Sequence, residues 1–217
     1  MNEELARRFA EITGAKGVAG DVVSPPDLGA LTAIARICDE QDLGIRVTSG
    51  APTTSNSAPS GGIVISLQRL NAIEVAAGGL TVRAGAGATV AHLRDAVAKQ
   101  KLGVVGLGAQ TGSAHVGTLV ARGEVARRAL AGVEAVLATG ESVKAGGAVL
   151  KDVVGYDLLS VMLGSVGRLA VIAAVTFRLE PAAAKTPTAK PPGAVAWQPA
   201  LAAAFDPKGL LRPAASP

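Results

Sequence analysis

Reactive and metal-binding side chains are scarce in this chain of 217 residues. It contains one cysteine, Cys38, and two histidines, His92 and His115. A single cysteine excludes an internal disulfide, a thiolate zinc site and a cysteine-ligated iron–sulfur cluster. Two histidines are too few for a multi-histidine metal site. We therefore expect no metal centre within the chain.

Aromatic side chains are also rare, at 2% of the chain, and long apolar runs are missing. Few aromatics argue against a nucleic-acid binder that stacks bases, and the net charge of +4 comes from scattered lysines and arginines. No run is long enough to span a membrane, and residues 1–14 mix charged and apolar side chains, unlike a signal peptide. We expect a cytoplasmic protein that neither inserts into a membrane nor binds nucleic acid.

Glycine, proline and small aliphatic residues are abundant, with 27 glycines, 12 prolines and a hydrophobic share of 49%. This composition indicates a core of Val, Leu, Ile and Ala with many turns, in one domain or two closely packed lobes. Asn2 and Asp27 are placed to cap two helices, the second closing at Gly44. Short β segments at 21–23 and 45–47 flank the second helix, which predicts a small βαβ unit.

A polar loop at 48–62 separates this unit from a part of the chain with a different pattern. β segments are expected there at 63–67, 73–75, 80–84, 133–137, 142–145 and 169–179. Thr89 and Asp157 are placed to cap helices between these segments. The pattern divides the chain into an N-terminal lobe (1–60), a second lobe (61–180), and a proline- and alanine-rich tether with a docking segment (181–217).

Several strings resemble one known family and occur in its order. GIRVTSGAPT (44–53) resembles a strand and phosphate-gripping loop written G-I-x-V-x-P-x-G-x-G-T, and VEAVLATGE (133–141) resembles "veVVlaDGe". KDVVGYDLLSVMLGSVGRLAVIAAVTFRL (151–179) is similar to a signature of the glycolate-oxidase group. FDPKGLLRP (205–213) resembles the closing motif "lDPxgilNPG". Together these strings resemble the FAD-linked oxidases of the vanillyl-alcohol-oxidase family.

This resemblance implies an α+β, PCMH-type FAD-binding fold of two α/β lobes. The N-terminal lobe would be a βαβ unit, and the second a larger antiparallel or mixed sheet with flanking helices. Family members carry a substrate-binding cap domain between the strand at 169–179 and the closing motif. Here only residues 180–195 lie between them, so the cap is expected to be absent. The small FAD-binding subunit of bacterial glycolate oxidase is the family member that the chain resembles most.

The resemblance also implies a cofactor site, because backbone amides and glycines must come close to the FAD pyrophosphate. The residues implied to contact FAD are Ser49, Gly50, Ala51, Thr53, Thr54, Gly112, Val116, Gly117, Thr118, Gly167, Val171 and Ile172. Pro52, Thr118 and Ala170 stand where the family has glycine. The loop has no His, Cys or Tyr for covalent attachment, so FAD is expected to be bound non-covalently. His115 and Tyr156, near these segments, could pack structurally or approach the flavin.

The implied function is that of an FAD-binding subunit in a glycolate- or D-lactate-oxidase-type complex. Its partners would be a full-length FAD-linked oxidase subunit and an iron–sulfur subunit. Relatives hold the 2-hydroxy acid with Arg and His side chains of the cap, so this chain is expected to have no catalytic residue and no turnover alone. The alternative is a flavin-free scaffold that docks onto the catalytic chain, which the three replaced glycines favour.

Overall fold

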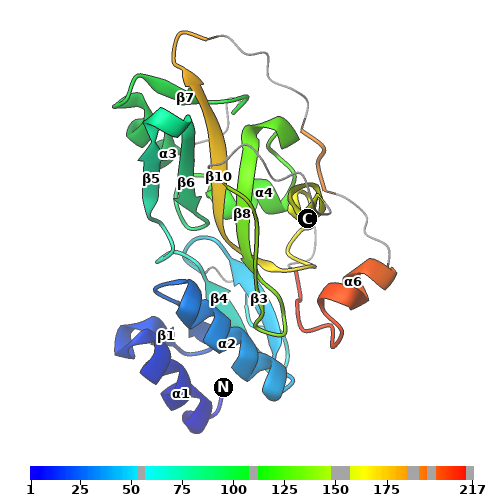
Figure 1. The fold of residues 1–217 in the computed structure, drawn as a ribbon. Helices are drawn as coiled ribbons and strands as arrows, with labels where there is room; N and C mark the ends of the chain where they lie inside the picture. Colours follow the sequence, from blue (N-terminus) through cyan, green and yellow to red (C-terminus); the bar gives the residue numbers. More distant parts are fainter. Residues whose placement is uncertain (53–56, 108–111, 148–156, 185–190, 195–198, 214–217) are drawn as a thin grey trace.

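The computed structural model describes residues 1–217 except 53–56, 108–111, 148–156, 185–190, 195–198 and 214–217. A smaller sheet with helices α1 and α2 forms one lobe, and a larger sheet with helices α3 and α4 forms the other (Figure 1). None of the helices in the described part of the chain has the length and apolarity needed to cross a membrane. The expected α+β fold of two lobes is confirmed.

The two helices of the first lobe begin at the predicted caps. In α1 (Glu3–Thr13) the Asn2 Oδ1 atom accepts a hydrogen bond from Leu5 N at 2.9 Å. In α2 (Leu28–Glu40) the Asp27 Oδ1 atom accepts one from Ala30 N at 2.8 Å. The predicted end of α2 at Gly44 is wrong, because the helix stops at Glu40 and Gly44 already opens a strand.

The smaller sheet contains β1 (Val18–Ala19), β2 (Val22–Val23), β3 (Gly44–Thr48) and β4 (Gly62–Ser66), in the order β1-β2-β4-β3. The sequence predicts β2 and β3 as a βαβ unit, but β4 lies between them and runs parallel to both. The reason is that Ile63–Ile65 is apolar on both faces and fully buried, which suits a central strand of a parallel sheet. The lobe boundary at residue 60 stays a prediction.

The larger sheet is antiparallel, in the order β5-β6-β10-β8-β9. Its strands are β5 (Ile73–Ala76), β6 (Thr81–Gly85), β8 (Leu130–Val136), β9 (Ser142–Gly146) and β10 (Val171–Pro181), and β7 (Leu102–Val104) pairs with the end of β10. The predicted β segments at 133–137 and 142–145 form an antiparallel hairpin, and the strand predicted at 169–179, β10, lies at the centre of the sheet.

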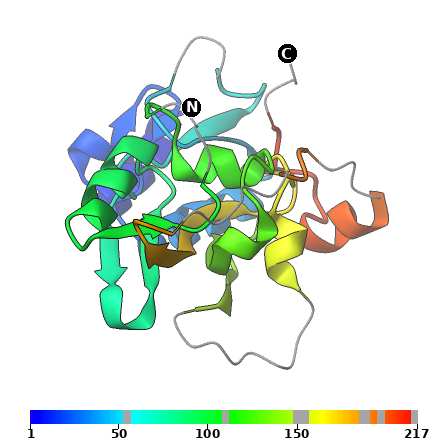
Figure 2. The same cartoon turned by 90° about the horizontal axis from the view of Figure 1, so that it is seen from above.

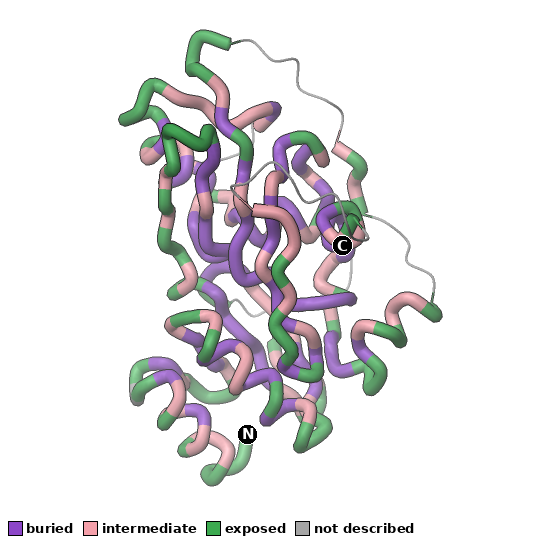
Figure 3. Tube along the Cα trace, in the orientation of Figure 1, coloured by how far each residue is buried: buried purple, intermediate pink, exposed green. Residues whose placement is uncertain are grey.

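Helices α3 (Val90–Ala98) and α4 (Val116–Ala121) cover one face of the larger sheet (Figure 2). Alternate strand residues such as Val82 and Phe177 are buried in the core cluster that these helices share. The opposite face carries charge: the Arg83 Nε and Nη2 atoms donate to the two carboxylate oxygens of Glu134 at 2.9 and 2.8 Å. Buried segments therefore follow the strands and the inner helix faces (Figure 3).

The two lobes share a second hydrophobic cluster. It joins Leu31 and Ile34 of α2 to Val136 of β8 and Val171 of β10. Because each of these side chains is at most 1% exposed, neither lobe covers its own inner face without the other. The two lobes are therefore closely packed against each other, and we expect them to move as one rigid unit.

The C-terminal part of the chain returns to the first lobe. After β10, the described residues 191–194 and 199–213, which we call the tail, include α6 (Pro199–Phe205). Leu211 forms a parallel bridge with Ile45 of β3, and Leu210 and Leu211 are 4% and 6% exposed. The side chains of Leu201 and Phe205 are half-buried, and Trp197 lies outside the described residues. The tail thus extends the smaller sheet beyond β3.

Candidate functional site

A cavity of about 510 Å³ lies where the two lobes and the tail meet. Its walls come from five segments that are far apart in the sequence: β3 with Ser49, Leu67, α4 with the residues that follow it, the turn at 166–172, and the tail. The tail residues in the wall are Gly193, Ala194, Arg212 and Pro213. Three of these five segments include residues of strings that resemble the family, namely 44–53, 151–179 and 205–213. Leu67 lies next to β4.

The structure brings half of the predicted site residues together. Those that line the cavity are Ser49, Gly117, Thr118, Gly167, Val171 and Ile172. Four others lie outside the lining: Gly50, Ala51, Gly112 and Val116. Thr53 and Thr54 lie outside the described residues. The assignment of these residues to the cofactor stays a prediction, with the cavity as its location.

The loop after β3 is held close to the start of α4. Ser66 Oγ donates to Gly50 O at 2.9 Å, and Ser49 is 8% exposed. A Cβ atom on Gly50 would lie 2.6 Å from Cε1 of His115, so a larger residue at this position would require the imidazole to shift. Burial lowers the pKa of His115, which favours the neutral imidazole. His115 therefore packs against the loop, the first of the two roles that the sequence left open.

The first amides of α4 are already used within the fold. Val116 N donates to Ala88 O and Gly117 N donates to Ala86 O, both at 2.9 Å. A Cβ atom on Gly117 would lie 2.7 Å from Ser49 Oγ, so this glycine serves the packing of α4 against the β3 loop. The lining at this end includes Ser49 and Thr118, whose side chains carry hydroxyl groups.

The turn between α5 (Leu158–Met162) and β10 forms another wall. Gly164 and Gly167 have positive φ angles of 81° and 72°, and Val166 has one of 54°. Val166 N donates to Ala121 O at 2.7 Å, which ties the turn to the end of α4. Gly167 faces open space where a Cβ atom would lie, so this position of the wall is free of side-chain bulk. The turn leads into Ala170, Val171 and Ile172, apolar residues that also line the cavity.

Asp157 has a structural role. It caps α5 by accepting from Ser160 N at 3.2 Å, as predicted. It also forms a bidentate ion pair with Arg127, at 2.7 Å from Nη2 and 3.2 Å from Nε. The hydrogen bond from Arg127 lowers the pKa of Asp157 to about 2. Tyr156, which the sequence singled out with it, lies outside the described residues.

Sequence reasoning missed the charged residues of the cavity. Arg122 and Glu124 follow α4, with Arg122 Nη1 at 4.0 Å from Glu124 Oε1. Arg212 comes from the tail. A signal was present for Arg212, because it occupies the asparagine position of the motif "lDPxgilNPG". Two arginines and one glutamate give this part of the lining one net positive charge, which suits a ligand with phosphate groups.

The lining is compatible with a flavin nucleotide. The volume of the cavity lies within the roughly 300–1,000 Å³ of typical ligand pockets. Ile45, Val47 and Ile172 provide apolar surface for a flat ring system, and the hydroxyls and guanidinium groups provide donors for phosphate oxygens. Among the described lining residues there is no Cys, His or Tyr for a covalent flavin link.

Comparison with known proteins identifies the class. A family model described as an FAD-binding domain matches residues 21–155, and the chain belongs to this family. The resemblance to FAD-linked oxidases, the PCMH-type fold and FAD as the cofactor of the domain are thereby confirmed.

Particular relatives lie among oxidoreductases. A D-lactate dehydrogenase of Archaeoglobus fulgidus is 34% identical over 172 residues, covering 74% of this chain and 38% of the relative. The glycolate oxidase subunit GlcD of Bacillus subtilis is 28% identical over 174 residues, covering 74% and 37%. The chain thus spans less than half the length of these relatives. The structure of 4-ethylphenol oxidase from Gulosibacter chungangensis shares the fold, with a TM-score of 0.65 at 18% identity, covering 82% of this chain and 42% of that one.

Proposed function

We propose that this chain is an FAD-binding subunit of a glycolate- or D-lactate-oxidase-type complex and that it binds FAD non-covalently in the cavity between its lobes. The observation that carries the proposal is that distant family-like segments, including 44–53, 151–179 and 205–213, contribute to one cavity. A shared fold alone would not require these segments to retain a space of ligand size between them.

The residues of the cavity have distinct proposed roles. Bound FAD would supply a two-electron acceptor. Ile45, Val47 and Ile172 would hold the flat part of the cofactor and exclude water from it. Ser49 and Thr118 would donate hydroxyl hydrogen bonds, and Arg212 would balance the charge of the pyrophosphate. These roles concern binding and orientation, and none of them moves a proton on the substrate.

The chain is not proposed to be catalytic alone. Residues 182–198 join β10 to α6. This connecting segment is far shorter than a domain. Oxidation of a 2-hydroxy acid needs a group that holds the carboxylate and a base that takes the hydroxyl proton. No histidine is present among the described residues of the lining, and its charged members there are Arg122, Glu124 and Arg212.

The proposed partners are a full-length FAD-linked oxidase subunit and an iron–sulfur subunit, within the cytoplasm. The similarity to a protein named as a glycolate oxidase subunit supports an assembly. An iron–sulfur partner follows from chemistry, because electrons that leave a flavin need an acceptor and one cysteine cannot hold a cluster.

Titration with FAD tests the cofactor assignment. The purified chain should bind FAD with a change in flavin absorbance and fluorescence, and acid precipitation should release the flavin into the supernatant. Flavin that stays with the acid-precipitated protein would contradict non-covalent binding. A chain that binds no FAD would contradict the whole proposal.

A flavin-free scaffold is the second candidate, and specific observations favour it. Pro52 has no amide to donate, and the amides of Val116 and Gly117 are bonded to Ala88 and Ala86. A scaffold would co-purify with the full-length oxidase subunit and yet give no spectral change with FAD. The same titration, combined with a pull-down of the oxidase subunit, separates the two functions.

A further inference from the structure

The tail forms part of the cavity wall from two sides. On one side Gly193 and Ala194 line the cavity, and Gly193 N donates to Gly123 O at 3.0 Å directly after α4. On the other side Arg212 and Pro213 line it. The cavity is therefore bounded by the second lobe, the first lobe and the returning tail together.

Backbone hydrogen bonds hold the second side of the tail in place. Ile45 N donates to Leu210 O, and Arg212 N donates to Ile45 O, both at 2.7 Å. Ile45 is thus both a lining residue and the docking residue of the tail. A shift of the docked tail would therefore alter the cavity wall at Ile45.

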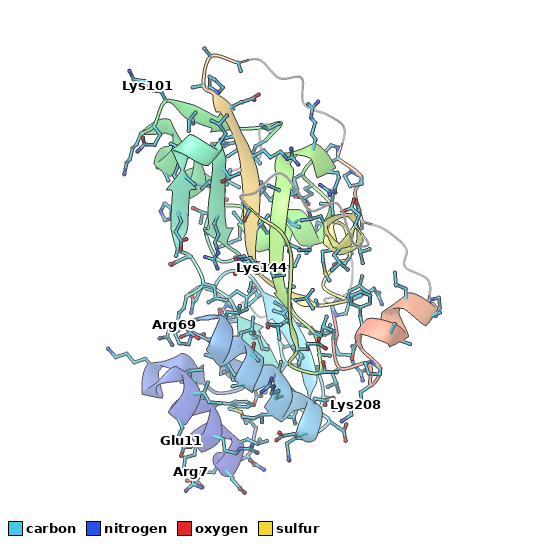
Figure 4. The ribbon with its side chains drawn as sticks, viewed as in Figure 1. Arg7, Glu11, Arg69, Lys101, Lys144 and Lys208 are labelled. Atoms are coloured by element: carbon cyan, nitrogen blue, oxygen red, sulfur yellow. The ribbon has the colours of Figure 1, made fainter. Side chains whose placement is uncertain are left out.

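Side chains add to this docking. Asp206, which is 7% exposed, accepts from Leu210 N at 2.9 Å and from Leu211 N at 2.7 Å. Lys208 Nζ lies 3.3 Å from Asp39 Oδ1 and 3.1 Å from Asp42 Oδ1, close to the end of α2 (Figure 4). The tail is therefore attached to the first lobe by a strand-like bridge and an ion-pair cluster, and the buried Asp206 carboxylate holds the turn within the tail that presents Leu210 and Leu211.

We propose that the tail is the outer wall of the FAD site and that tail docking and FAD binding are thermodynamically linked. The inference rests on the proposed function and adds that the chain supplies this wall itself. FAD that contacts the wall binds the docked state more tightly than the undocked state. By linkage, bound FAD must then stabilise the docked tail by the same factor.

Gly123→Ala tests one direction of the linkage. Gly123 has a φ of 67°, and a Cβ atom there would overlap the Gly193 carbonyl, so the substitution pushes residues 191–194 away from the cavity. Gly20→Ala is the matched control, because Gly20 has a φ of 60° and no atom within 4 Å of the added Cβ. Backbone strain is similar in both variants, and only Gly123→Ala displaces the tail.

The expected result is that FAD affinity falls by about tenfold or more in Gly123→Ala and stays within about twofold in Gly20→Ala. Circular dichroism checks that both variants are folded at the titration temperature. Hydrogen exchange on the wild-type chain tests the other direction: saturating FAD should slow exchange of the Ile45 and Arg212 amides.

Equal FAD affinity in both variants, or unchanged exchange of these amides in the FAD-bound wild type, would overturn the linkage while leaving FAD binding intact. A wild-type chain that does not bind FAD would overturn the proposed function and this inference with it.

Discussion

Gly117 shows how one residue can serve packing at a site where the sequence suggested contact with phosphate. Its amide donates to Ala86 O at 2.9 Å, and an added Cβ would lie 2.7 Å from Ser49 Oγ and 2.8 Å from Ala86 Cβ. Gly117→Ala should therefore destabilise the fold by about 1–3 kcal/mol, as overpacking of a buried site does. Denaturant unfolding measures this change.

Gly78→Ala is the control for Gly117→Ala, because Gly78 is exposed and no atom lies within 4 Å of an added Cβ. Its free energy of unfolding should change by less than about 0.5 kcal/mol. Equal effects of the two substitutions would contradict the packing role of Gly117.

Arg212 is one of the three charged residues in the described part of the lining, none of which was predicted from the sequence pattern. Arg212→Gln keeps the backbone bonds to Ile45 and removes the positive charge near the cavity. FAD affinity should fall by about three- to tenfold, since the side chain is exposed and its charge is partly screened. Affinity for riboflavin, which lacks phosphate, should change much less.

Arg168→Gln serves as the control for Arg212→Gln. Arg168 is exposed, lies next to Gly167 and is outside the cavity lining. If both variants weaken FAD equally, the effect would come from the overall charge and not from the site.

Asp157 gives a pH-dependent prediction. The hydrogen bond from Arg127 lowers its pKa from 3.8 to about 2, so the charged form favours the folded state. This contribution is complete above the unfolded pKa and is lost as the pH falls from about 4 to about 2. Because the pair is half exposed, Asp157→Asn should cost at most about 1 kcal/mol at pH 7. The melting temperatures of variant and wild type should converge near pH 2, and a constant difference would contradict the ion-pair explanation.

At the scale of elements, the tail behaves as an added strand at the β3 edge. Leu210 and Leu211 are buried there, and burial of a leucine side chain is worth about 1.5–3 kcal/mol. The entropy cost of closing the tether rises only slowly with its length. A chain that ends at Ala184, which keeps β10 complete, should therefore melt at a lower temperature than the full chain.

Asp206→Ala in the full chain should reproduce part of this loss, because the amides of Leu210 and Leu211 lose their acceptor. A shortened chain with an unchanged melting temperature would show that the docked tail adds no net stability.

At the scale of the whole molecule, the composition of the cavity wall predicts that the chain depends on a partner for turnover. The chain with FAD should not oxidise glycolate or D-lactate when an artificial electron acceptor is supplied. The physical reason is that the described lining has no histidine and that residues 182–198 are too few to form a cap domain. Steady-state assays measure this, and robust turnover by the pure single chain would show that a substrate site exists elsewhere.

Much of the local structure could be predicted from the sequence. Asn2, Asp27, Thr89 and Asp157 cap the expected helices because a cap depends on a side chain and an amide only three residues away. The hairpin at 133–145 could also be predicted, because its two strands are joined by a short turn and lie close together in the sequence. The segments of the candidate site were also identified, through strings of residues that resemble a family.

What the sequence determined by itself is therefore local: caps, turns and the apolar pattern of each strand, all set by neighbours along the chain. Only the tertiary structure decided which distant groups meet. It placed β4 between β2 and β3, paired the Gly117 amide with the Ala86 carbonyl, and brought Arg212 beside Ile45 near the start of β3. These outcomes depend on which buried surfaces and backbone groups satisfy one another across the fold, and no spacing of residues along the chain encodes that choice.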